Sequence, residues 1–382
     1  MWLFWSLCWA SEPESLSQLV EEVWSRHPQV AAANVHVQQQ ELSPQSTIKW
    51  KEPNLSLSIA PMGAGYSIRV QQPFLYRQEF SLEQKKREAY IHKSKLSQQQ
   101  IKEELQHSFL LHLADWMYAK RKLELSQQHY KIIAKHKKSV LGRVEVGSLP
   151  KVVLAQLESE LADLSLLRIG YQTDLNKHQI RIEEFLGRPV SSDLSLDIPP
   201  AVSPDNQKPS YLKLPSLEKK VYSIQSDIIR TKKRPPLFFS MGHSNMMMDP
   251  NKWWTLGVGM QIPTNNQHKE VLINIEHLKE QEVHFREQAL YEEWEAKIRA
   301  EKKITEGLLL QRDVLKKQTK KAIEREYATI EAAFEAGQVS IDSVLRAEHK
   351  RVRVQDNEAQ IIKKLWYSYA NQLFFFGRNV GE

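Results

Sequence analysis

Two stretches of this chain are almost free of the residues that interrupt helices, and they restrict its possible folds more than any other feature. Residues 74–141 contain neither Gly nor Pro, and within 264–336 the only such residue is Gly307. Apolar residues recur three and four positions apart in both stretches, as Ile323 and Tyr327 do. At about 1.5 Å per residue, such helices would exceed roughly 100 Å. The pattern predicts extended, coiled-coil-like helices, because a globular domain has no room for them.

The two halves of the chain repeat one another. Pro73 precedes Gly147 by the same interval by which Pro263 precedes Gly337. A long stretch with helical periodicity fills the interval in each half. Agreement over such a distance is hard to obtain by chance, so the chain is predicted to be an internal duplication.

Each duplicated glycine is expected to mark a reversal of the chain between two helices. Gly supplies the backbone freedom that a tight turn needs, and Pro150 and Ser340 suit the first positions of a returning helix. Glycines also follow the two return helices and are predicted to end them: Gly187 and Gly377.

A pair of short strands is expected before each long helix. Residues 53–59 and 66–72 alternate apolar and polar side chains around a Pro- and Gly-containing break, and 237–243 and 254–262 do the same around a loop. A short amphipathic helix precedes each pair, the first over 19–30. Each half is therefore predicted to be helix, β-hairpin, long helix, turn and return helix.

Four segments follow along the chain. Residues 1–10 are interpreted as a truncated signal peptide, because an apolar start leads to a Cys8-x-Ala10 sequence that suits signal peptidase. A lipidated Cys8 and a plain apolar terminus are the alternatives. The other segments are a first repeat, a Pro- and Ser-rich linker and a second repeat: 11–187, 188–215 and 216–382.

Composition argues against several classes of protein. The net charge is +7, but the Lys and Arg residues are interspersed with Glu along the expected helices. This distribution favours solvated helix faces over nucleic-acid binding. Cys8 is the only cysteine, so neither a disulfide framework nor a thiolate metal site is expected. The 13 His residues are scattered, without H-E-x-x-H or a compact His and carboxylate cluster, and nucleotide-binding and nucleophile motifs are missing. We expect no enzyme and no cofactor.

The strands suggest a membrane barrel that several chains complete. No apolar run after Ala10 reaches the roughly 18 residues of a transmembrane helix. Four strands cannot close a barrel, but three copies would supply about twelve. Aromatic residues at the strand borders would form the interfacial girdles: Tyr66, Phe74, Tyr76, Phe238, Phe239, Trp253 and Trp254. The alternative is a soluble coiled-coil scaffold capped by two hairpins.

The duplicated order of strand pair, long helix, Val-Gly or Ala-Gly turn and return helix resembles the TolC family of outer-membrane efflux proteins. The resemblance covers nearly the whole chain after residue 10. It implies a mainly α homotrimer with a 12-stranded β-barrel in the outer membrane of a Gram-negative bacterium and an α-helical barrel crossing the periplasm. It also implies a passive duct that docks to a periplasmic adaptor and an inner-membrane pump.

The resemblance transfers functional positions only at the two turns, which in this family close the periplasmic mouth and meet the adaptor. Gly147 and Gly337 match best. Charged residues around them are candidates for a ring that holds the mouth shut or selects cations: Arg143, Glu145, Glu335 and Asp342. Val152 and Val153 depart from the family pattern, which often has an acidic residue there.

One further cluster bears on the substrate. His243, Met246, Met247 and Met248 are expected in the outer loop of the second hairpin, and imidazole and thioether suit soft ions such as Cu(I). Heavy-metal efflux is one hypothesis on this basis. Efflux of drugs or other small organic molecules and type I protein secretion are the alternatives, with the methionines as packing residues.

Overall fold

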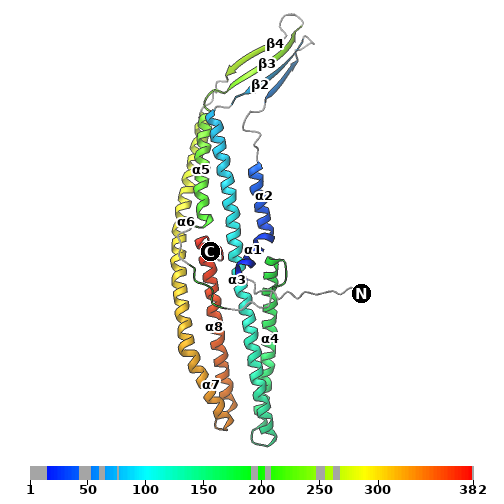
Figure 1. The fold of residues 1–382 in the computed structure, drawn as a ribbon, viewed down its shortest axis with the longest axis vertical. Helices are drawn as coiled ribbons and strands as arrows, with labels where there is room; N and C mark the ends of the chain where they lie inside the picture. Colours follow the sequence, from blue (N-terminus) through cyan, green and yellow to red (C-terminus); the bar gives the residue numbers. More distant parts are fainter. Residues whose placement is uncertain are drawn as a thin grey trace, which may run out of the picture. The chain divides into compact units, whose positions relative to one another are not determined.

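The computed structural model describes residues 15–42, 53–59, 65–74, 77–190, 197–202, 208–246, 254–260 and 267–380. Helices make up most of this part of the chain, and four strands form one sheet (Figure 1). The elements are α1 (Leu16–Arg26), α2 (Pro28–Leu42), β1 (Asn54–Ile59), β2 (Gly65–Pro73), α3 (Arg77–Glu145), α4 (Lys151–Leu186), α5 (Ser210–Thr231), β3 (Leu237–Met246), β4 (Trp254–Met260), α6 (Gln267–Val314), η2 (Leu315–Thr319), α7 (Lys320–Glu335) and α8 (Ile341–Phe376). The expected signal peptide, residues 1–10, lies outside the described residues. The predicted mainly α fold with a small β part is confirmed.

The long helices have equal lengths in the two halves. Helix α3 has 69 residues, and α6, η2 and α7 form one continuous helix that begins and ends at equivalent positions when Gly147 is aligned with Gly337. The return helices α4 and α8 have 36 residues each. The interruption η2 is a π turn within the second long helix. The predicted repeat of long helix, turn and return helix is confirmed.

The halves differ before their strands. The single amphipathic helix expected over 19–30 is broken at His27, whose ψ of 129° is extended. Pro28 explains the break, because proline lacks an N–H and disfavours the helical conformation of the preceding residue. In the second half α5 is continuous and begins at Ser210, so the last residues of the expected linker 188–215 are helical.

The chain forms two compact units, and each combines segments from both halves. Unit 1 takes the residues up to Val30, 102–209 and those from Trp294 on. Unit 2 takes 31–101 and 210–293. None of the helices in the described part of the chain combines the length and the hydropathy that a transmembrane helix requires.

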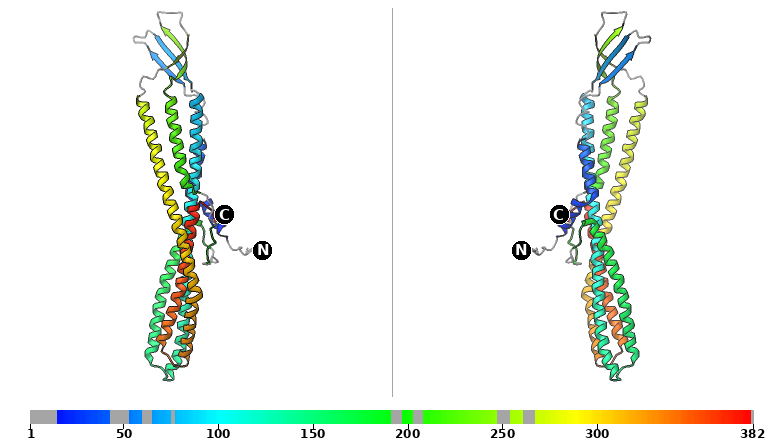
Figure 2. Two further views of the ribbon diagram at one scale, coloured as in Figure 1. Left: turned by 90° about the vertical axis from the view of Figure 1, so that its left-hand side faces the viewer. Right: turned by 90° about the vertical axis from the view of Figure 1, so that its right-hand side faces the viewer.

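In unit 1, α3 and α8 are the central pair of helices. The ring of His107 on α3 is hydrogen-bonded to Asn371 on α8, with 2.7 Å between Nε2 and Oδ1, and the Tyr367 hydroxyl on α8 donates to Asp115 on α3 at 2.6 Å. Helices α4 and α7 lie on either side of this pair (Figures 1 and 2). The central helix α8 has buried residues along most of its length, whereas the flanking helix α4 has only four. The buried residues of α4 are Leu157, Leu164, Ile182 and Leu186.

In unit 2, α5 lies between the first part of α3 and the first part of α6 (Figure 2). Ala89 of α3 packs against Val221, Ile224 and Ile228 of α5. Glu218 of α5 pairs with Lys93 of α3 at 2.6 Å and approaches Arg286 of α6 at 3.6 Å. This packing holds the ends of the helices from which the strands continue.

The sheet has the order β1-β2-β3-β4 with every neighbouring pair antiparallel. Its central pair joins the two halves, with Gly65 opposite Met246 and Pro73 opposite Phe238. Strands β1 and β4 are the ends of the order, so each has one edge unpaired within the chain. The two predicted hairpins are confirmed, although β3 continues to Met246, past the expected end at residue 243.

The register gives the sheet one apolar and one polar face. Leu55, Val70, Met241 and Leu256 are opposite one another across the four strands and therefore share a face. The neighbouring row, on the other face, contains Ser56, Arg69, Gly242 and Thr255. The apolar face is exposed in the single chain: Leu55, Leu57, Tyr66, Ile68, Val70, Leu237, Phe239, Met241, Trp254, Leu256, Val258 and Met260.

Candidate functional site

The two helical turns of unit 1 have the same backbone conformation. Gly147 has a φ of 75° and Gly337 a φ of 73°, in the left-handed region that favours glycine. The amide of Ser148 donates to the Arg143 carbonyl at 2.8 Å, and the amide of Gln338 donates to the Ala333 carbonyl at 2.8 Å. Together with the bonds from the glycine amides to residues three positions earlier, these are Schellman turns that satisfy the last carbonyls of the long helices. The predicted reversals at both glycines are confirmed.

Arg143 connects the first turn to the second. Its Nη1 donates to the Phe334 carbonyl at 3.2 Å, and its guanidinium lies 5.3 Å from the centre of the Phe334 ring. Its own carbonyl accepts bonds from Ser148 in the first turn. In the single chain, Arg143 therefore joins the end of α3 to the end of α7.

An apolar core lies directly behind the turns. Residues of all four helices contribute to it, so the two hairpins share one core at this end of unit 1. Its buried members are Ile133, Val140, Leu157, Leu164, Phe334, Ile341 and Val344. A well-packed apolar core therefore supports both turns.

The acidic candidates have a different environment from Arg143. Glu145, Glu335 and Asp342 are exposed, as are the glycines beside them. Val146 and Val152 next to the first turn are exposed as well, with 79% and 61% of their surface accessible. The single chain thus leaves acidic and apolar side chains together at the turns. A charged ring made by several copies stays a prediction.

The candidate soft-metal residues are only partly described. His243 lies in strand β3 rather than in a loop, with its ring between Tyr66 at 6.0 Å and Trp254 at 5.0 Å. Met246 is the last residue of the strand. Met247 and Met248 lie outside the described residues, so this candidate site stays a prediction.

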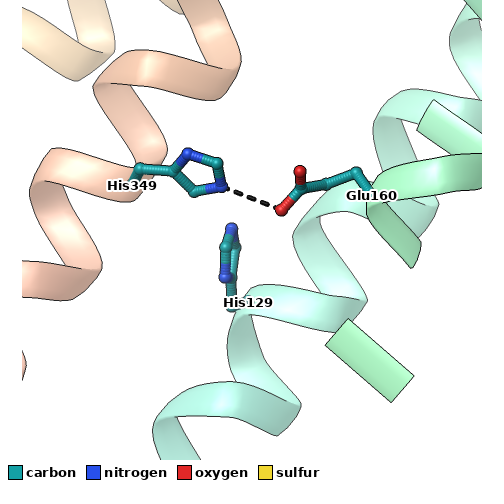
Figure 3. Close-up of side chains that lie close together, drawn as sticks. All are labelled: His129, Glu160 and His349. Atoms are coloured by element: carbon teal, nitrogen blue, oxygen red, sulfur yellow. Dashed lines mark hydrogen bonds and ion pairs between the residues drawn. The ribbon is translucent and has the colours of Figure 1, made fainter. Parts of the chain in front are cut away.

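Sequence analysis missed a cluster in the same unit. His129 of α3, Glu160 of α4 and His349 of α8 each offer one ligand atom, and these atoms lie within 4.8 Å of one another (Figure 3). The expectation that no compact His and carboxylate cluster exists is therefore wrong. The cluster went unrecognised because each residue comes from a different helix. The only sequence signal was the nearly equal distance of Glu160 and His349 from the turn glycines that precede them.

Comparisons with known proteins identify the fold. No family model and no curated protein sequence matches the chain. Solved structures do match over nearly their whole lengths. The outer membrane protein VceC of Vibrio cholerae has a TM-score of 0.79 at 11% identity, covering 94% of this chain and 95% of that one. The CmeC outer membrane channel of Campylobacter jejuni has a TM-score of 0.76 at 13% identity, covering 99% and 92%.

A third structure, of CusC, described in connection with transmembrane channel formation, has a TM-score of 0.78 at 11% identity and covers 94% of this chain and 91% of that one. The chain therefore has the fold of the TolC-like outer-membrane channels. Identities this low establish the shared fold, and the activity is argued separately from the residues of this chain.

Proposed function

We propose that this chain is one protomer of a trimeric exit duct of the outer membrane. Three copies complete a 12-stranded barrel from their four-stranded sheets, and their helices form a tube that extends into the periplasm. The duct is passive. An inner-membrane pump supplies the energy, and a periplasmic adaptor joins the pump to the helical turns. The outer membrane protein VceC and the outer membrane channel CmeC share the fold.

The observation that carries the proposal is the exposed apolar face of the sheet. A soluble protein seldom leaves a contiguous apolar surface that crosses four strands in contact with water. Apolar side chains on one face and polar ones on the other are the pattern of an outer-membrane barrel, whose outer face meets lipid. Tyr66 and Trp254 lie toward one end of this face and Phe239 toward the other, as interfacial girdles require.

The unpaired edges support the assembly of several copies. Backbone groups in a bilayer need partners, and β1 and β4 each leave one edge open in the single chain. In unit 1, exposed apolar residues on the flanking helices offer a second surface for neighbouring copies: Leu166, Leu167, Ile169 and Ile180 on α4, and Ile304, Leu309, Leu310 and Val314 on α6. Neighbouring copies would pair with the strand edges of unit 2 and, separately, cover these helices of unit 1.

The turns are the proposed contact for the adaptor. Val146 and Val152 provide exposed apolar surface, and Glu145, Glu335 and Asp342 add exposed negative charge at the two turns. Arg143 keeps the two turns of one chain together. Reversal of an exposed charge, as in Glu335→Lys, is expected to weaken adaptor binding without changing the thermal stability of the purified duct.

The lipid-facing role of the sheet is tested by two neighbouring substitutions. Leu256→Arg places a charge on the apolar face, which costs about 2–4 kcal/mol near the middle of a bilayer. We expect strong loss of the protein from the outer-membrane fraction. Thr255→Arg, on the polar face, is the matched control and should accumulate nearly as the wild type does. Equal accumulation of the two variants would contradict a lipid contact at Leu256.

The efflux role is tested in a strain that lacks the gene. The strain is exposed to copper, silver, zinc and cobalt beside a panel of hydrophobic drugs and detergents, and complemented with the wild type. Selective metal sensitivity supports a metal exporter and makes His243 and Met246 to Met248 the next residues to vary. Selective drug sensitivity supports a multidrug duct. Unchanged tolerance to both panels contradicts small-molecule efflux and favours protein secretion.

A further inference from the structure

His129, Glu160 and His349 bring together three groups that bind metal ions well. Two imidazoles and one carboxylate form the His₂Glu ligand set, which holds zinc together with a water molecule in many proteins. The Nε2 atom of His349 lies 2.8 Å from Oε1 of Glu160, and the ligand atoms of all three residues lie within 4.8 Å of one another. Zinc bonds of about 2.0–2.1 Å place tetrahedral ligand atoms about 3.4 Å apart. One observed separation, 2.8 Å, is shorter than that value and none exceeds 4.8 Å, so side-chain rotations are enough to reach tetrahedral spacing.

The buried member of the cluster independently points to a ligand. His129 is 4% exposed, and its Nε2 has no hydrogen-bond partner. A buried polar atom without a partner costs free energy that a bound ion would recover. Its ring faces Glu160 and His349 (Figure 3). The hydrogen bond between Glu160 and His349 does not provide a partner for the Nε2 atom of His129.

The charges around the cluster leave it open to a cation. Two of the neighbouring cations have partners of their own: Arg351 pairs with Glu348 at 2.9 Å, and Lys122 lies 4.5 Å from the centre of the Tyr171 ring.

Space for a further ligand adjoins the cluster. A cavity of about 290 Å³ is lined by all three residues together with Lys122, Tyr171 and Arg353. A water molecule in this cavity is able to fill the fourth position of a tetrahedral site.

We propose that His129, Glu160 and His349 bind a divalent first-row transition-metal ion, with Zn²⁺ as the best match to the ligand set. The site joins the first hairpin, through α3 and α4, to the return helix α8 of the second. A bound ion therefore acts as a cross-link between the two halves. This site is separate from the turns and from His243 and its methionines, and it does not depend on the proposed export function.

The test uses the purified full chain in detergent after treatment with a chelator. Co²⁺ is titrated while its visible absorption is followed, since tetrahedral Co²⁺ absorbs more strongly than the aqueous ion, and Zn²⁺ is then added as a competitor. We expect one ion per chain and displacement of Co²⁺ by Zn²⁺. His129→Gln, Glu160→Gln and His349→Gln should each weaken binding at least tenfold.

Two substitutions serve as matched controls. His136→Gln removes another buried histidine of α3, and Glu158→Gln removes a neighbouring carboxylate of α4. Neither should change the affinity. His349 is half exposed, so His349→Gln is expected to fold even if His129→Gln does not.

Thermal unfolding supplies a second measurement. Zn²⁺ should raise the unfolding midpoint of the wild type and of both controls, but not that of the variants at the three ligands. Absence of saturable binding to the wild type would overturn the proposal. Binding that is equally strong in His349→Gln would overturn it as well, because the ion would then occupy another place.

Discussion

The two helical hairpins of unit 1 agree in length and in the conformation of their turns, but they differ in their surroundings. Helices α4 and α8 have 36 residues each and end at left-handed glycines, Gly187 and Gly377. Buried residues occur along the whole length of α8, from Ile341 to Phe376, whereas only four residues of α4 are buried. Local sequence signals thus gave both hairpins helices of the same length that end at a left-handed glycine. The burial of each helix depends instead on its neighbours in the unit. The exposed α4 is a surface that we assign to contacts between copies.

The largest expected difference is at the ends of the long helices. Phe334 of α7 is 3% exposed in the shared core, and its repeat equivalent on α3, Val144, is only partly buried. Phe334→Ala should cost about 3–5 kcal/mol, since it leaves a cavity and removes the ring beneath Arg143. Val144→Ala should cost about 1–2 kcal/mol. Thermal unfolding followed by circular dichroism at a fixed protein concentration measures the loss of stability in both variants. Equal losses would contradict the predicted difference between the two helix ends.

A smaller difference is expected at the two glycines that end the return helices. Alanine at either position adopts an unfavourable positive φ, at a cost of about 1–2 kcal/mol. At Gly377 the new Cβ would also lie 2.7 Å from the Cα of Pro209, whereas at Gly187 its nearest neighbour would be the Arg26 side chain at 4.0 Å. Gly377→Ala should therefore lose about 1–3 kcal/mol more than Gly187→Ala. A larger loss at Gly187, measured from the same unfolding curves, would contradict the close approach of Pro209.

The smallest effects are expected at two equivalent glutamates. Glu158 on α4 is 54% exposed in its side chain and pairs with Lys137 at 2.9 Å, so Glu158→Gln should change stability by at most about 1 kcal/mol. Glu348 on α8 is fully buried and pairs with Arg351.

Burial raises the pKa of the Glu348 carboxyl above its ordinary value. The folded state therefore holds this proton more tightly than the unfolded state does. The stability that results is fully present below the unfolded pKa and is lost as the pH rises through the folded pKa. Relative to Glu348→Gln, the wild type should lose stability as the pH is raised from about 4.5, which unfolding curves at several pH values will measure. A flat difference would contradict the raised pKa.

The repeated features of the fold were predictable because they rest on local chemistry. The near absence of Gly and Pro and the three-four spacing of apolar residues predicted the long helices, and Gly147 and Gly337 predicted both turns. The break at His27 was missed, although Pro28 signalled it. The order of the helices was not predictable, because the same apolar pattern serves a central helix and a flanking one.

The candidate site was predictable in position but not in its contacts. The turn residues were found by their place in the repeat, whereas the bond from Arg143 to Phe334 depends on packing between hairpins. The cluster of His129, Glu160 and His349 depends on three helices at once. Spacing along one helix could not reveal it.

The assembly of several copies is the central claim, and the mass of the protein extracted from the outer membrane tests it most directly. The chain is expressed with an outer-membrane export signal, extracted in mild detergent and weighed by native mass spectrometry. The account predicts recovery from the outer-membrane fraction and a mass of three chains. A single chain, or recovery in the soluble fraction, would contradict it.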